Sequence, residues 1–233
     1  MVDLADWQRT LGIRFKDPSL LEQALVHSSY VNENPGAAPT SNERLEFLGD
    51  SVLGIVIAEK LYNRYPYCSE GEMTKMRSAL VRSSTLRNIA ESISLGEYIY
   101  LGKGEEASGG RHKTANLAGA MESLIAAVFL DQGLDTTREF ILRLFGTELE
   151  KLADNDNLID YKSQLQHLYQ SHYKKTPVYH TTETAGVEQD RIFIAEVRIN
   201  ETVLGTGYGR NKKTAETRAA RSALEKVGDV FTQ

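Results

Sequence analysis

Three carboxylates in the first third of the chain have the residue types and spacing for chemistry. Glu43, Glu46 and Asp50 are separated by three and then four residues, so on a helix they share one face. Carboxylates held side by side repel one another, and a divalent cation relieves that repulsion. Mg²⁺ prefers such oxygen ligands, and a bound ion would activate water and stabilise charge on a phosphate. The plainer interpretation is a solvated helix face with three ordinary surface acids.

Helices must position these groups, because apolar residues recur at helical spacing through most of the first 152 residues. The stripe beside the carboxylates contains Leu45, Leu48, Val52 and Ile55, which we expect to be buried on the opposite side of that helix. Further periodic stretches lie at 20–25, 57–61, 76–89, 117–130 and 140–152. The sequence therefore predicts an all-α first domain over residues 1–152.

The pattern changes after a short polar segment, residues 153–157, which we expect to be a linker. Beyond it the sequence predicts a helix over about 159–170, strands at 178–184, 191–199 and 202–208, and a helix over 212–227. Asn200-Glu201 suits a tight turn between the last two strands. This order predicts a small α+β (α-β-β-β-α) domain over residues 158–229.

Charge is distributed unevenly along the chain. The net charge is −5, which alone argues against a nucleic-acid partner. However, residues 158–233 carry 11 Lys and Arg against 9 Asp and Glu, whereas the preceding part has a deficit of seven positive charges. An acidic first part and a mildly basic second part suit a metal site joined to a phosphate-binding module, although solvated faces give similar numbers.

The sequence favours a cytoplasmic protein without a membrane partner. The longest apolar run, Leu124–Leu130, is too short for a membrane span. No basic-then-apolar signal region begins the sequence. The single cysteine, Cys68, cannot form an internal disulfide, and we expect it to be inert.

Residues 42–53, NERLEFLGDSVL, strongly resemble the signature of the ribonuclease III family. Other segments that resemble the family are spread across the chain in the expected order: ALVHSSY (24–30), EGEMTKMRSALV (70–81), LGKGEEASGGR (101–111) and ESLIAAVFLDQG (122–133). The resemblance implies a helical endonuclease domain that acts as a homodimer and hydrolyses double-stranded RNA with Mg²⁺, or with Mn²⁺ as a substitute. It also implies 5′-phosphate and 3′-hydroxyl ends with a short 3′ overhang, and substrates that are structured precursors of ribosomal and messenger RNA.

The same resemblance assigns roles to the carboxylates. Glu43, Glu46 and Asp50 match the family's first group of acidic active-site residues, and Glu122 matches a residue of a later helix. We expect Glu46 and Glu122 to bind the metal directly. Asp50 would hold a water ligand and orient the attacking hydroxide, whereas Glu43 would bind a second ion or help to position the reacting groups. The sequence does not decide whether the site binds one metal ion or two.

A homodimer follows from the geometry of a double cut. One carboxylate cluster cuts one strand, so a staggered cut needs two clusters related by a two-fold axis. Phe47 matches the aromatic residue that such domains insert into their partner. A core position for Phe47 is the alternative.

The second acidic helix departs from the family at Gly119. The family has Asp and Glu three residues apart in a run resembling LADAxEALI, whereas residues 117–125 read LAGAMESLI. Three interpretations are open: an active enzyme in which water or Asn116 takes over the missing contact, an enzyme with weakened or altered metal binding, and an RNA-binding protein that does not cleave. We favour activity, because the other four carboxylates remain.

Residues 158–228 resemble the double-stranded RNA-binding domain, through YKSQLQHLYQ (161–170) and VLGTGYGRNKKTAETRAARSAL (203–224). The resemblance places the start of the last helix on phosphates and the first helix in the minor groove. The expected RNA-binding residues are Lys162, Ser163, Gln164, His167, Gln189, Arg210, Lys212 and Lys213. Two of them depart from the family: His167 stands where Glu is frequent, and Gln189 stands where His is frequent.

His27, in the segment ALVHSSY, could be taken for a general base. Water activated by a metal needs no histidine. We therefore expect His27 to be structural and hydrogen-bonded within the helical core.

Overall fold

The structure, a computed structural model, describes residues 4–36, 40–153, 159–183 and 192–231. The chain divides into two compact units. The first comprises Met1–Tyr65 and Met73–Leu152, and the second comprises Pro66–Glu72 and Ala153–Gln233. Most of the expected linker, residues 154–157, lies outside the described residues, as does Gln189.

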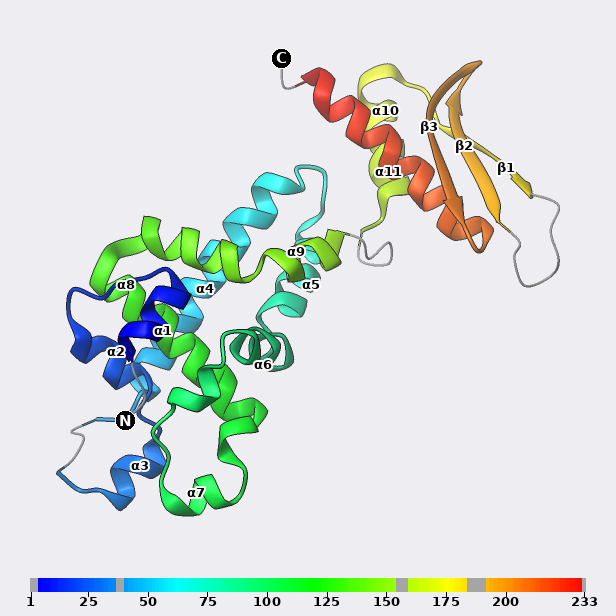
Figure 1. The fold of residues 1–233 in the computed structure, drawn as a ribbon. Helices are drawn as coiled ribbons and strands as arrows, with labels where there is room; N and C mark the ends of the chain where they lie inside the picture. Colours follow the sequence, from blue (N-terminus) through cyan, green and yellow to red (C-terminus); the bar gives the residue numbers. More distant parts are fainter. Residues whose placement is uncertain (1–3, 37–39, 154–158, 184–191, 232–233) are drawn as a thin grey trace. The chain divides into compact units, whose positions relative to one another are not determined.

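The first unit is helical, as the sequence predicts (Figure 1). Its helices are α1 (Leu4–Leu11), α2 (Pro18–Ala24), α3 (Ser28–Glu33), α4 (Glu43–Arg64), α5 (Glu70–Val81, which begins in the second unit), α6 (Ser83–Ser92), α7 (Lys103–Ala107), α8 (Thr114–Leu144) and α9 (Gly146–Ala153). Two short 3₁₀ turns, η1 (Leu95–Tyr98) and η2 (Gly110–His112), lie on either side of α7.

At two places the helices are interrupted where apolar periodicity does not predict it. The stretch 76–89 is interrupted at Arg82, whose extended backbone (φ −65°, ψ 149°) separates α5 from α6. Within α8, Gly133 has φ 82° and ψ 179°, so the helix is kinked there. Glycine adopts this conformation readily because it has no Cβ. Apolar spacing reports which residues are buried, and it does not report these backbone turns.

The core of the first unit lies where α4 packs along α8, with α2 and α6 also against α8. The buried apolar side chains of α4 are Leu45, Val52, Leu53, Val56, Ile57 and Leu61, and those in the first half of α8 include Leu117, Met121, Leu124, Ile125 and Val128. The expectation that Ile55 is buried is wrong, because 59% of its surface is exposed. Ile55 lies six residues after Gly49, which contacts α8, and is therefore about a third of a turn away from that contact around the helix.

By length and composition α8 could cross a membrane, but 61% of its most apolar window is buried inside the protein. An apolar helix surrounded by other helices is a core helix.

The second unit contains α10 (Tyr161–Tyr173), a sheet of β1 (Val178–Glu183), β2 (Phe193–Ile199) and β3 (Thr202–Gly209), and α11 (Lys212–Phe231). The strands are antiparallel in the order β1-β2-β3, and α11 packs on the sheet beside α10 (Figure 1). Gly205 and Gly207 of β3 approach α11 so closely that a Cβ on either would overlap its backbone. Asn200 has φ 53° in the β2–β3 turn. The predicted α-β-β-β-α order is therefore confirmed.

Candidate functional site

The crossing of α4 and α8 brings the two acidic segments together. A Cβ on Gly49 would overlap the backbone carbonyl of Glu122, so the helices touch there through backbone. Gly49 lies between Glu46 and Asp50 in the sequence. The close approach therefore brings Glu46 and Asp50 near enough to Glu122 for their charges to raise its pKa.

Buried hydrogen bonds fix the start of α4 against α8. Asn42 is buried, its backbone N–H donates to Val26 (2.8 Å), and its side-chain amide donates to the Ala24 carbonyl (3.3 Å). The buried hydroxyl of Ser123 lies 3.2 Å from the Asn42 carbonyl and 2.8 Å from that of Gly119. These contacts hold the register between the two acidic helices.

The electrostatics of the cluster favour a cation. Burial, with the nearby charges of Asp50 and Glu46 as smaller causes, raises the pKa of Glu122 to about 7. The pKa of Glu46 is also raised, by burial and by Glu43, while His27 opposes the shift. Groups that resist ionisation because of one another are stabilised in their charged form by a positive ion.

The four carboxylates differ in their surroundings. Glu46 and Glu122 are half-buried, and Asp50 and Glu43 are exposed. Glu43 accepts a hydrogen bond from the Ser41 hydroxyl (2.6 Å). Among the described residues no three His, Cys, Asp or Glu side chains converge closely enough to hold an ion in this conformation. The set nevertheless fits a hard divalent cation in chemistry, since it consists of mutually repelling carboxylate oxygens.

His27 is hydrogen-bonded, as we expected, but it is half-buried at the start of α3 and does not lie in the core. It caps α3, because its Nδ1 accepts from the Ser29 backbone N–H (3.2 Å) and lies 2.8 Å from the Ser29 hydroxyl. That hydroxyl in turn accepts from the Gly102 backbone N–H (2.9 Å). His27 and Ser29 therefore tie the start of α3 to the segment before α7.

Asn116 is already engaged with the loop around α7. Its amide donates to Glu105 (2.8 Å) and to the Gly110 carbonyl (3.0 Å). Lys113 and Asn116 hold the pKa of Glu105 below its usual value by hydrogen bonding to it. Glu105 was not predicted from the sequence, because apolar periodicity does not show that Lys113 and Asn116 contact it in the fold.

Phe47 does not lie in the core, because 79% of its surface is exposed. Ile55 and Tyr62, also on α4, are 59% and 71% exposed. Spacings of eight and seven residues place all three on one side of the helix. We call Phe47, Ile55 and Tyr62 the exposed apolar stripe of α4.

In the second unit, Arg210, Lys212 and Lys213 are exposed at the start of α11. Asn211 caps this helix, because its side-chain oxygen accepts from the Thr214 backbone N–H (2.8 Å). The N-terminus of a helix attracts anions through its free N–H groups. The two lysines therefore surround a position suited to a phosphate.

The expected RNA-binding residues of α10 have partners within the second unit. Lys162 forms an ion pair with Glu216 (2.7 Å) and lies 4.5 Å from the centre of the Tyr179 ring. Ser163 donates its hydroxyl to Asp160 (2.7 Å), which caps α10. Lys162 thus helps to join α10, β1 and α11.

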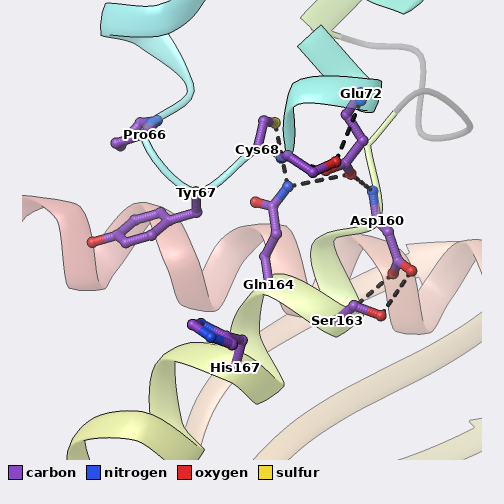
Figure 2. A pocket seen from close by; sticks show the side chains of 9 residues that line it. Pro66, Tyr67, Cys68, Glu72, Asp160, Ser163, Gln164 and His167 are labelled. Carbon is purple, nitrogen blue, oxygen red and sulfur yellow. Dashed lines mark hydrogen bonds between the residues drawn. The ribbon is translucent and has the colours of Figure 1, made fainter.

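Ser163, Gln164 and His167 line a pocket together with residues of the segment Pro66–Glu72 (Figure 2). The Gln164 amide lies 3.2 Å from Cys68 Sγ and 3.4 Å from Glu72 Oε1. Burial raises the pKa of the Cys68 thiol, so the reactive thiolate is disfavoured. The pocket therefore gives no support to a nucleophilic role for Cys68.

Comparison with known proteins agrees with this architecture. Residues 17–149 match the family described as Ribonuclease-III-like, and residues 161–227 match the double-stranded RNA binding motif. Ribonuclease 3 of Dehalococcoides mccartyi (strain CBDB1) is 51% identical over 232 residues, which cover 100% of this chain and 98% of the relative. Ribonuclease 3 of Roseiflexus sp. (strain RS-1) is 47% identical over 92% of each chain.

The fold of the first unit also has a solved counterpart. The nuclease domain of ribonuclease III from Campylobacter jejuni is 36% identical, with a TM-score of 0.58, and the match covers 64% of this chain and 97% of that one. A second structure of that Campylobacter jejuni domain shows structural flexibility in a region involved in dimer formation. The chain belongs to the ribonuclease III family. It is an endoribonuclease of a generally metal-dependent family and carries a double-stranded RNA-binding module.

Proposed function

We propose that this endoribonuclease uses Mg²⁺ to hydrolyse double-stranded RNA, with Mn²⁺ able to replace Mg²⁺. The observation that carries the proposal is the environment of Glu122. Its carboxyl group is half-buried, and burial together with Asp50 and Glu46 raises its pKa to about 7. A divalent cation offsets that repulsion. A surface cluster with no cation to bind would gain nothing from this arrangement.

Glu46 and Glu122 are the proposed direct ligands, because they are half-buried and come from the two helices that touch at Gly49. A bound Mg²⁺ supplies a Lewis acid and lowers the pKa of water. The exposed Asp50 orients the attacking water molecule. Glu43, held by Ser41, positions the phosphate or serves a second ion.

Water attack at phosphorus, with departure of the 3′ oxygen, leaves a 5′-phosphate and a 3′-hydroxyl. Two such sites related by a two-fold axis would cut both strands and leave a short 3′ overhang. We therefore propose a homodimer in which the exposed apolar stripe of α4 packs against a second copy, with Phe47 inserted into the partner. The exposure of Phe47, Ile55 and Tyr62 supports this interface.

The second domain, residues 158–229, would hold the duplex. Lys212 and Lys213 would contact phosphates through the start of α11, with Arg210 beside them. Ser163, Gln164 and His167 would face the minor groove, where Gln164 would exchange its contacts with Cys68 and Glu72 for contacts with RNA. Gln189 and Lys162 complete the proposed set, although Lys162 would have to leave Glu216.

The proposed substrates are structured precursors of ribosomal and messenger RNA in the cytoplasm. A second function, a double-stranded RNA-binding dimer that does not cleave, is favoured by one observation: Gly119 provides no carboxylate where the family has Asp. The two functions share every RNA contact. They differ only in what the carboxylates do.

Glu122→Gln separates binding from cleavage. We expect cleavage to fall by at least about 100-fold, the upper end of the effect of removing a group that merely supports a metal ligand. Gel-shift affinity measured in EDTA should be unchanged. The matched control is Glu139→Gln, an exposed position on the same helix, which should cleave normally. Cleavage by Glu122→Gln at the wild-type rate would refute the ligand assignment.

A further inference from the structure

The side chain of Glu46 lies against the backbone of α8 at Gly119. A Cβ on Gly119 would be 2.6 Å from Glu46 Oε2, 2.9 Å from its Cδ and 3.2 Å from its Oε1. Real Cβ atoms do not approach other atoms closer than about 3 Å, because the van der Waals repulsion is too steep. Any side chain at position 119 therefore forces the Glu46 carboxylate, the far end of a flexible side chain, to shift from its present place.

The three atoms nearest to a Cβ at Gly119 all belong to Glu46. Asn116, one helical turn earlier, directs its amide to Glu105 and to the Gly110 carbonyl. The carbonyl of Gly119 itself accepts from Ser123 (2.8 Å), so the α8 backbone is held in place here. The sequence suggested Asn116 as a substitute for the missing Asp, but its side chain is hydrogen-bonded to the α7 loop. The side chain in contact with position 119 is Glu46.

The location of the Glu46 carboxylate matters because positions 119 and 122 share one face of α8. The Glu46 oxygen beside Gly119 therefore lies on the face of α8 that carries Glu122. Although Glu46 belongs to α4, it supplies negative charge where a side chain of residue 119 would supply it.

We infer that Gly119 is a positioning residue for the metal site: the missing side chain lets Glu46 lie on α8 and substitute for the absent Asp. The inference rests on the proposed metal-dependent function. The replacement of the family's Asp by Gly119 would thus determine where the Glu46 carboxylate lies. Adding a methyl group at position 119 removes a ligand from its place, and adding a carboxylate replaces that ligand.

Binding of Mn²⁺ to the full-length protein, measured by electron paramagnetic resonance of the free ion, tests this directly. We expect Gly119→Ala to weaken Mn²⁺ binding by about 10-fold or more, the range found when the support of a metal ligand is lost. Gly119→Asp should stay within about threefold of wild type, because the new carboxylate offsets the displacement of Glu46. Gly146→Ala is the matched control, since a Cβ there meets nothing within 4 Å, and it should bind as wild type does.

Rescue gives a second measurement that does not depend on the alanine variant. Glu46→Gln should lose Mn²⁺ affinity, and adding Gly119→Asp should restore most of it, whereas adding Gly119→Ala should not. Thermal unfolding in EDTA checks that each variant is folded. Wild-type affinity in Gly119→Ala, or failure of Gly119→Asp to rescue Glu46→Gln, would overturn the inference alone. Wild-type protein that neither binds Mn²⁺ nor cleaves RNA would overturn the proposed function as well.

Discussion

Gly49 of α4 touches the backbone carbonyl of Glu122 of α8, and this contact joins the two halves of the carboxylate cluster. A glycine is required because any Cβ would overlap that carbonyl. The contact brings Glu46 and Asp50, on either side of Gly49, to the helix that carries Glu122. The geometry of the site therefore depends on a residue without a functional group.

Gly49→Ala should destabilise the first domain by about 3 kcal/mol, because a methyl group forced against backbone cannot be accommodated by a rotamer change. Urea unfolding monitored by circular dichroism measures the effect. Gly146→Ala, with open space around its Cβ, should change the unfolding free energy by less than about 1 kcal/mol. Equal stability of Gly49→Ala and wild type would mean that α4 and α8 are further apart than the structure has them.

The raised pKa of Glu122 predicts a pH dependence of stability in EDTA. Its folded-state pKa of about 7 exceeds the ordinary glutamate value of 4.5, so between these values the folded state binds more protons than the unfolded state. The unfolding free energy contributed by Glu122 therefore falls as pH rises through this window. Burial is the first cause, and Asp50 and Glu46 add to it.

Urea unfolding at about pH 5 and about pH 8 checks this dependence. Relative to wild type, Glu122→Gln should become more stable as pH rises, because the amide carries no charge. Glu139→Gln should follow wild type at both pH values. A Glu122→Gln curve parallel to wild type would indicate a Glu122 carboxyl with an ordinary pKa.

The exposed apolar stripe of α4 predicts a mutation that separates the copies. Phe47→Ala should shift the protein from dimer to monomer in sedimentation equilibrium, since a large aromatic side chain that anchors an interface contributes about 2 kcal/mol or more. Leu130→Ala, which removes another exposed apolar side chain outside the stripe, should leave the dimer intact. A dimer unaffected by Phe47→Ala would place the interface elsewhere.

The start of α11 predicts a salt-dependent contribution to RNA binding. Replacing Lys212 and Lys213 by Gln should weaken duplex binding and reduce the slope of log K against log salt by roughly two, one for each lost phosphate contact. The matched control replaces Lys174 and Lys175 by Gln. These lysines are exposed at the C-terminal end of α10, and their replacement removes the same amount of charge. Identical slopes for both double variants would show that the effect is one of net charge and not of position.

The helices and the carboxylates were predictable from the sequence because helical spacing puts Glu43, Glu46 and Asp50 on one face whatever the tertiary packing. Apolar spacing also predicted the helical first part of the chain and the order of helices and strands in the second. What it could not give is the direction in which a helix faces its neighbours. Ile55 was assigned to the core for that reason, although the face of α4 toward α8 runs through Leu45, Val52 and Val56.

Contacts that depend on tertiary structure were equally out of reach. The buried pair Asn42 and Ser123 holds α4 to α8 through backbone carbonyls, and neither residue has a distinctive spacing. Lys162 carries the charge expected of an RNA ligand, yet its ion pair with Glu216 is visible only in the folded domain. Gly119 was identified as a departure from the family, but its contact with Glu46 required coordinates.

We propose above all that the carboxylates at the α4–α8 crossing form a working Mg²⁺ site. The most direct test incubates the protein with a perfect RNA duplex of about 30 base pairs, roughly twice the span of one RNA-binding domain, with Mg²⁺ or with EDTA. We expect cleavage of both strands with Mg²⁺ alone, giving 5′-phosphate ends and a short 3′ overhang. A duplex that stays intact with Mg²⁺ at saturating protein, while a gel shift shows it bound, would contradict the account.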